Sequence, residues 1–252
     1  MVIRELKARY KNSVLGFFWS LLNPLGMMLV FMVVFGIFMP NNSLERYPIF
    51  LLCGLLPWNC FNASLMSSIG SIIGNANLVQ KAYFPREVLP IAAVLAQLVN
   101  FLLALIVLFA LLIIFSTPFS LWLLLLPFVI FMQTCFALGL SMILATLNVF
   151  YRDTMMILDV TLLAWFFLTP IFYPLDLLPV SAELWGMNLD VHRLMYILNP
   201  MASIINTYRD LLYWGYRTDL DFLMRTFITS MAVLVLGYWI FTRYSGSFGE
   251  EV

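Results

Sequence analysis

Very few side chains in this sequence are of the types that perform covalent chemistry. The single histidine, His192, has no second histidine with which to hold a metal or relay a proton. The three cysteines, Cys53, Cys60 and Cys135, lie inside apolar runs and have neither the spacing of a zinc site nor that of a disulfide framework. We interpret them as small buried hydrophobic residues. The sequence therefore predicts no metal and no catalytic residue.

Asp159 is the only carboxylate within one of the long apolar runs. A carboxylate inside a membrane marks a functional site by default. Asp159 lies little more than a turn from the end of its run, however, so a side chain that extends to the membrane surface explains it more simply than a proton pathway. Because HExxH, GxSxG and cysteine–histidine pairings are also missing, the sequence predicts that the chain is not an enzyme.

Two large classes of partner are disfavoured by the sequence. It contains no G-x-x-x-x-G-K-[ST] phosphate loop, so we expect no nucleotide cofactor in this chain. Its 13 Lys and Arg residues balance 13 Asp and Glu residues, which gives no excess of positive charge for a nucleic acid.

The composition is that of an integral membrane protein. Hydrophobic residues make up 63% of the chain and charged residues 10%, and the mean hydropathy is +0.97. Soluble domains carry about 25% charged residues, so this chain has too few of them to cover a globule. The basic N-terminal segment leads into an apolar run that is too long for a signal peptide.

Six apolar segments are long enough to cross a bilayer as helices, since the hydrocarbon core requires roughly 20 residues. They cover about 14–39, 49–73, 88–115, 121–148, 155–173 and 222–242. Several prolines interrupt these segments, namely Pro24, Pro57, Pro127 and Pro170, and each can kink its helix. We expect one all-α transmembrane domain over residues 1–252, without the internal repeat that is typical of secondary carriers.

The basic residues predict the orientation of these spans. An even number of spans places both termini on one side of the membrane. If that side is the cytoplasm, 8 of the 13 Lys and Arg residues lie inside and 5 outside, as the positive-inside rule requires. The first span usually decides topology, and four of the inside cations precede it. We therefore expect both termini in the cytoplasm.

Residues 1–13 predict an amphipathic helix in the headgroup layer. Apolar residues such as Ile3 and Leu6 recur at helical spacing beside the cations Arg4 and Lys7. A simple basic anchor of the first span would explain the same residues, and the two interpretations are compatible.

A charged, proline-punctuated elbow, GNANLVQKAYFPREVLP, joins the second and third apolar segments from Gly74 to Pro90. The expected orientation places it in the cytoplasm. From composition alone it is either a loop with ordinary anchoring cations or a docking element for a partner.

Residues 174–220 are too apolar for a plain extracellular loop and too interrupted to span. Asn199 and Pro200 form a good helix start, with a capping side chain followed by proline at the first turn. The helix that follows has about 14 residues and a length of about 21 Å, which is too short to cross the membrane. We expect a re-entrant or interfacial helix in the outer leaflet, and an extracellular loop is the alternative.

Five motifs occur in an order that resembles one family. They are ELKARYKNSVLGFFWSLLNPLGMMLVFMVVF, GLLPWNCFNASL, NLVQKAYFPREVLP, LNVFYRDT and LTPIFYPLDLLP…LNPMASIINTYRDLLY. Together they resemble the membrane subunit of type-2 ABC exporters. The subgroup they resemble most moves lipid-linked polysaccharides, such as O-antigen and wall teichoic acid, across the bacterial plasma membrane. The resemblance extends over nearly the whole chain.

The resemblance implies partners and sites. It implies a second copy of the chain and two separate ATP-binding-cassette ATPase subunits, which would carry the ATP and magnesium. In this family the loop between spans two and three is a coupling helix that docks on the ATPase, and short helices before the last span form an outer gate. These roles fall on residues 75–86 and 174–220. The coupling residues it implies are Asn77, Leu78, Val79, Lys81, Tyr83 and Phe84.

The expected cargo suggests two further sets of residues. Aromatic rings and amides suit the faces of sugars, which makes Trp19, Trp58, Asn59, Phe61, Asn62 and Tyr173 the candidates for a translocation path. The diphosphate of a lipid carrier needs cations at the inner membrane face, and the available ones are Arg4, Lys7, Arg9 and Lys11. An exporter of a small drug or lipid is an alternative function, as is an autonomous channel or secondary carrier.

Overall fold

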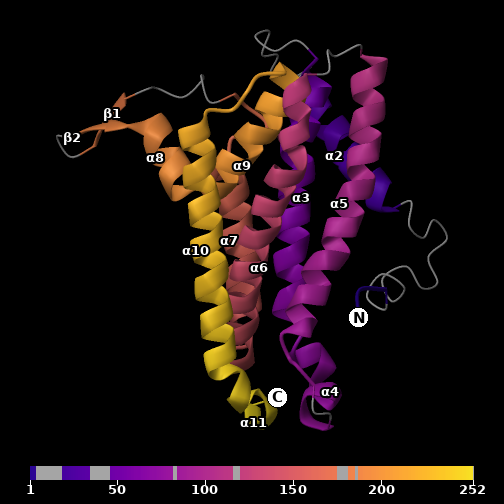
Figure 1. Cartoon of the computed structure of the whole chain (residues 1–252), viewed down its shortest axis with the longest axis vertical. Helices are drawn as coiled ribbons and strands as arrows, with labels where there is room; N and C mark the ends of the chain where they lie inside the picture. Colours follow the sequence, from indigo (N-terminus) through magenta and orange to yellow (C-terminus); the bar gives the residue numbers. More distant parts are fainter. Residues whose placement is uncertain are drawn as a thin grey trace.

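Long helices form an upright bundle (Figure 1). The computed structural model describes residues 1–3, 19–34, 46–81, 84–115, 120–174, 181–184 and 187–251. Within these residues, four helical stretches are long and apolar enough to cross a membrane: Tyr47–Ile69, Val88–Ile114, Leu121–Phe150 and Leu220–Glu251. They contain the helices α3 (Tyr47–Ile69), α5 (Val88–Ile114), α6 (Leu126–Phe150, preceded by η4, Leu121–Leu125) and α10 (Leu220–Tyr244).

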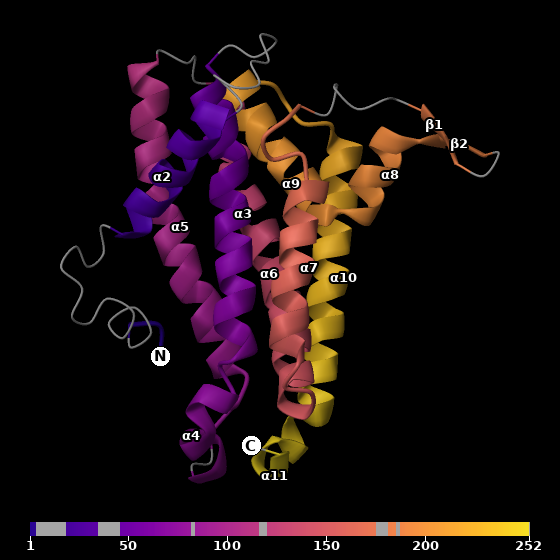
Figure 2. The ribbon, with the colours of Figure 1, turned by 180° about the vertical axis from the view of Figure 1, so that it is seen from behind.

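Shorter elements complete the described structure. They are α2 (Trp19–Val33), η3 (Ile73–Asn75), α4 (Ala76–Lys81), α7 (Thr154–Leu168), β1 (Ser181–Leu184), β2 (Met187–Asp190), α8 (Val191–Leu198), α9 (Pro200–Arg209), η6 (Asp210–Trp214), η7 (Ser245–Ser247) and α11 (Phe248–Glu251). Figures 1 and 2 show α4 and α11 at one end of the bundle, and α8 with the two strands at the opposite end.

The four long stretches coincide with the spans expected at 49–73, 88–115, 121–148 and 222–242. The other two expected spans, 14–39 and 155–173, correspond to α2 and α7, each with 15 residues in its described helix. Residues 14–18 and 35–39 lie outside the described part of the chain. Helix α7 stops at Leu168, before the predicted end, because Thr169 takes the extended backbone that the following proline favours.

The described part of the chain is all-helical as expected, apart from one short hairpin that the sequence did not predict. Strands β1 and β2 pair in antiparallel register, from Ser181 opposite Asp190 to Leu184 opposite Met187. Each strand has only four residues, and so short a segment gives no clear alternation of apolar and polar residues. The hairpin lies within the region that sequence analysis assigned to the outer gate.

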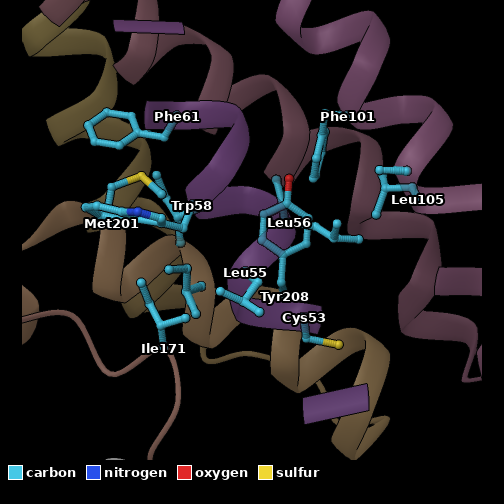
Figure 3. Packing of buried hydrophobic residues seen from close by; sticks show 14 of the residues in the cluster. Cys53, Leu55, Leu56, Trp58, Phe61, Phe101, Leu105, Ile171, Met201 and Tyr208 are labelled. Carbon is cyan, nitrogen blue, oxygen red and sulfur yellow. The ribbon is translucent and has the colours of Figure 1, made fainter. Parts of the chain in front are cut away.

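Helix α3 is the axis of the bundle. It packs against α2, α5, α6, α7 and α9, and its residues from Ile49 to Trp58 are all buried. Figure 3 shows Trp58 and Phe61 of α3 in the same interior cluster as Met201 and Tyr208 of α9. Protein surrounds α3 on every side from Ile49 to Trp58, and this half of the helix is therefore apolar all round and not along one stripe.

A second, smaller core lies at the end of the bundle that carries α4 and α11, and we call it the end cluster. It joins α4, α5, α6, α10 and α11. Its buried members are Ile72, Val79, Leu89, Met142, Ala145, Val149, Phe241 and Phe248, with Leu78, Phe84, Ile91 and Phe150 packed against them.

Helices α6 and α10 approach each other most closely at a pair of glycines. A Cβ atom added to Gly237 would lie 2.1 Å from the carbonyl oxygen of Gly139, and one added to Gly139 would lie 2.5 Å from that of Val233. No side chain can occupy either position without moving a backbone. Small residues at such crossings let membrane helices pack through backbone contact.

We predict that Gly237→Ala lowers the free energy of unfolding by about 1–3 kcal/mol, because the added methyl group forces α6 and α10 apart. Thermal unfolding of the detergent-purified protein measures this. Gly26→Ala in α2 is the control: a Cβ there meets nothing within 4 Å, and alanine favours a helix over glycine. Equal melting temperatures for Gly237→Ala and the unchanged protein would contradict the prediction.

Candidate functional site

The elbow between α3 and α5 folds into a short helical hook, formed by η3 and α4. The backbone N–H of Gly74 donates to the carbonyl oxygen of Gly70 at 2.8 Å, and the side-chain amide of Asn75 donates to that of Ser71 at 2.8 Å. Because of these bonds, the backbone continues in a helical conformation beyond the end of α3. The hook is therefore a structured projection of the bundle.

One face of α4 points into the protein and the other points outward. Val79 is 3% exposed and belongs to the end cluster, and Leu78 and Phe84 pack against that cluster. Asn77 and Gln80, three residues apart, are exposed.

This placement corrects the expectation that Val79 contacts a partner. Its side chain instead holds the hook to the bundle, because burying an apolar side chain against the chain's own core removes it from the outer surface. Of the remaining coupling residues, the side chain of Lys81 and all of Tyr83 lie outside the described part. Gln80 was not among the expected residues, although its spacing from Asn77 places both amides on one helix face.

The residues expected to line a translocation path do not lie together. Trp58 and Phe61 are buried in the core, so in this structure they pack the subunit and offer no surface to a cargo, contrary to expectation. Trp19 is exposed, while Asn59 and Tyr173 are partly buried.

Asn62 is likewise partly buried. The cations expected to receive a carrier diphosphate, Arg4, Lys7, Arg9 and Lys11, lie outside the described residues.

Trp165 of α7 joins the buried rings to a polar network that the sequence did not reveal. Its ring lies 5.3 Å from that of Phe61 and 6.4 Å from that of Trp58, centroid to centroid, and both pairs are nearly perpendicular or edge-on. The indole Nε1–H donates to Oδ1 of Asn199 at 2.8 Å. A tryptophan is buried readily only when this N–H finds an acceptor.

Asn199 was predicted to cap the helix that follows it, and this is confirmed. Its Oδ1 accepts from the backbone N–H of Ala202 at 3.2 Å, with Pro200 at the start of α9. The same side chain also donates through Nδ2 to Oγ1 of Thr169 at 2.8 Å. Asn199 thus satisfies the first turn of α9 and ties it to the end of α7.

The C-terminal end of α9 is held by hydrogen bonds of two more buried residues, Tyr208 of α9 and Gln133 of α6. The hydroxyl of Tyr208 donates to Oε1 of Gln133 at 2.8 Å, and Nε2 of Gln133 donates to the carbonyl oxygen of Pro57 at 3.1 Å. This chain of bonds connects α9 with α6 and α3. We call Asn199, Tyr208 and Arg209, together with the groups they bind, the α9 network.

Arg209 is the most unusual member of the network, because charged side chains are rarely buried and this one is only 3% exposed. Its guanidinium donates to the carbonyl oxygens of Pro170 and Ile171, and its central carbon lies 3.7 Å from the ring centroid of Phe50. Gly54 leaves room for it, because a Cβ there would lie 3.1 Å from Nη2. Two carbonyl oxygens and a ring face thus compensate the cation for its lost hydration.

Burial also changes the acid–base properties of this region. It lowers the pKa of Arg209 to about 10, against the opposing effect of nearby groups such as Asp210, so the guanidinium remains charged at neutral pH. Burial raises the pKa of Asp210, whereas the hydrogen bond from the Thr218 hydroxyl, 2.8 Å long, and the charge of Arg209 lower it. Through its hydrogen bond with Thr218, the Asp210 side chain anchors the segment that leads into α10.

Comparison with known proteins identifies the family of this chain. The family model described as ABC-2 type transporter matches residues 1–213. The chain belongs to the ABC-2 type transporter family. It is accordingly a membrane transport component.

Several curated proteins resemble this ABC-2 transporter over most of their length. The O-antigen export system permease protein RfbA of Myxococcus xanthus is 35% identical over 256 residues, which cover 100% of this chain and 94% of that protein. A protein of the same name from Klebsiella pneumoniae is 32% identical over 248 residues, covering 98% and 91%. The polysialic acid transport protein KpsM of Escherichia coli is 25% identical over 229 residues, covering 87% and 82%.

For this ABC-2 transporter we predict that Tyr208→Phe lowers the free energy of unfolding by about 1–3 kcal/mol, because Oε1 of the buried Gln133 loses its donor. Tyr216→Phe is the matched control, since Tyr216 is 69% exposed. Thermal unfolding in detergent compares the two variants. Similar small shifts for both would show that the bond between Tyr208 and Gln133 does not stabilise α9.

Proposed function

We propose that this chain is the transmembrane permease subunit of an ATP-driven exporter of lipid-linked polysaccharide in the bacterial plasma membrane. The observation that carries the proposal is the likeness, over essentially the whole chain, to proteins named O-antigen export permeases at 32–35% identity. The likeness to a polysialic acid transport protein supports a polysaccharide cargo in a wider sense.

The working assembly in this proposal has two copies of the chain and two separate ATPase subunits, which bind the ATP and magnesium. The hook supports an external partner, because α4 is anchored from behind by Val79 and presents the amides of Asn77 and Gln80 to the outside. Amides can donate and accept hydrogen bonds, so such a face suits a polar, tightly matched contact.

The proposed topology has six membrane-crossing segments with both termini in the cytoplasm. Four basic residues lie at or between helix ends at the end of the bundle that carries α4 and α11 (Figure 2): Lys81 ends α4, Arg86 lies between α4 and α5, Arg152 lies between α6 and α7, and Arg243 is in the last turn of α10. This clustering supports a cytoplasmic position for that end under the positive-inside rule. The opposite end, with α8, α9 and the hairpin, then faces outward and forms the gate region.

The experiment that tests the function is export by the purified complex. The chain is isolated from native membranes with its bound proteins, reconstituted in vesicles, and supplied with ATP and lipid-linked polysaccharide. Export that requires both ATP and the co-purified ATPase is expected. Transport of small drugs or lipids alone would favour the alternative type-2 exporter, and transport without the ATPase would favour a channel or secondary carrier.

The topology gives a labelling prediction. Cysteines introduced at Gln80 in α4 and at Tyr216 before α10 should react with an impermeant maleimide from opposite sides of the membrane, because the two positions lie at opposite ends of the bundle. Intact cells should label only the second. Labelling of both from outside would rule out the proposed orientation.

The two faces of α4 should respond differently to mutation. Replacing Asn77 and Gln80 together by alanine should weaken ATPase binding about tenfold while stability is kept, because both side chains are exposed. Val79→Ala should instead lower the free energy of unfolding by about 2 kcal/mol, since it creates a cavity in the end cluster. ATPase co-purification and thermal unfolding separate the two effects.

Arg152→Ala is the control for this experiment, since Arg152 is exposed near the start of α7 at the same end of the bundle. It should leave both ATPase binding and stability unchanged. Unaltered ATPase binding by the double alanine variant would remove the docking role from this face of α4.

A further inference from the structure

Helix α11 lies directly against the hook. It contacts both α4 and α6, and Figures 1 and 2 show it beside α4 at the same end of the bundle. The hook is joined through the backbone to α3 and α5 only. Its contact with α11 therefore adds a second connection, to helices far away in the sequence.

Phe248 is the centre of this connection. Its side chain is fully buried and lies in the end cluster with Val79 of α4 and Met142 of α6. Its ring lies 5.3 Å from that of Phe241 at the end of α10 and 6.2 Å from that of Phe150 at the end of α6, both in edge-to-face geometry. One side chain thus contacts the cluster shared by the hook and the ends of two spanning helices.

Two further features make this connection stiff. The turn between α10 and α11 is closed by side-chain hydrogen bonds, from Oγ of Ser245 to the carbonyl oxygen of Thr242 at 3.0 Å and from Oγ of Ser247 to that of Tyr244 at 2.9 Å. In the connection from α4 to α5, Arg86 adds a contact: a Cβ on Gly249 would lie 3.4 Å from its Nη2, so the Arg86 guanidinium lies against the backbone of α11.

Helices α6 and α10 are in turn packed backbone to backbone at Gly139 and Gly237, so we treat them as one unit. A displacement of α4 therefore reaches this pair through a packed cluster with few internal degrees of freedom. Without α11, the same displacement would lose the contact of α4 with the end of α10 and would depend on the chain connections to α3 and α5 and on the rest of the end cluster. Close-packed interiors transmit such strain because they deform little.

We propose that Phe248 is a positioning residue for transport, which links the hook to the α6–α10 pair so that a push on α4 moves the whole bundle. This inference rests on the proposed function, since the push is that of the ATPase. Phe248 itself has no surface for the ATPase or the cargo. It acts only through α4.

The first test needs no partner protein. A cysteine at Val79, a buried position, should react slowly with maleimide in the purified chain. Adding Phe248→Ala should raise the labelling rate by roughly tenfold or more, because loss of a buried phenyl ring loosens the packing behind α4. Phe248→Leu should restore slow labelling, and Glu250→Ala, exposed on the same helix, should leave it unchanged.

The second test uses the complex with the ATPase that co-purifies with the unchanged chain. In Phe248→Ala, ATPase binding and ATP hydrolysis per complex should persist, while export per ATP hydrolysed falls by roughly tenfold. Phe248→Leu should regain most of it. A merely structural role would instead lower the amount of complex and leave export per complex unchanged, which would overturn the inference.

The two proposals fail in different ways. If the unchanged chain retains no ATPase, the proposed function fails and the Val79 labelling rate alone decides whether Phe248 positions α4. If the unchanged complex exports polysaccharide but Phe248→Ala exports as much per ATP, the function stands and the role of Phe248 is wrong.

Discussion

The structure depends on how α9, a helix too short to cross a membrane, is buried among helices that are long enough to cross one. The first-turn N–H groups of α9 and its cation, Arg209, are all buried. An unsatisfied polar group in an apolar interior costs several kcal/mol, so each of them needs a partner. Asn199 satisfies the start of α9, Tyr208 reaches Gln133, and Arg209 binds the carbonyl groups that follow α7. These bonds tie α9 to α3, α6 and the end of α7, so the interruption of the membrane helices becomes a fixed joint.

The joint also explains the packing of α3. Helix α3 meets α2, α5, α6, α7 and α9 and has no exposed face from Ile49 to Trp58. It leaves room for the cation at Gly54 and is aromatic where the rings of α7 meet it, at Trp58 and Phe61. The sequence suggested that Trp58 and Phe61 line a path for sugars, but in the structure they fill the space between α3 and α7. An aromatic residue in a membrane helix can serve either purpose, and only its neighbours distinguish the two.

Local signals predicted part of this arrangement. The long apolar runs gave four spanning helices, and the pair Asn199–Pro200 gave the start of α9, because length and capping act within a few residues. The bonds of Asn199 to Trp165 and of Tyr208 to Gln133 join residues 34 and 75 positions apart, and no periodicity reports such distances. The same holds for Val79, whose burial depends on α11 at the other end of the sequence.

Helix α3 connects the two ends of the molecule. Its first turns carry Phe50 and Gly54, which hold Arg209 in the α9 network, and its last turn continues into the hook. Its 23 residues span about 34 Å as a continuous helix. Because residues Ile49 to Trp58 are buried on all sides, this half of α3 cannot bend away from its neighbours without opening the core. If α3 stays straight, a displacement of the hook has to move the α9 network as well, because Arg209 is packed against Phe50 and Gly54 of the same helix.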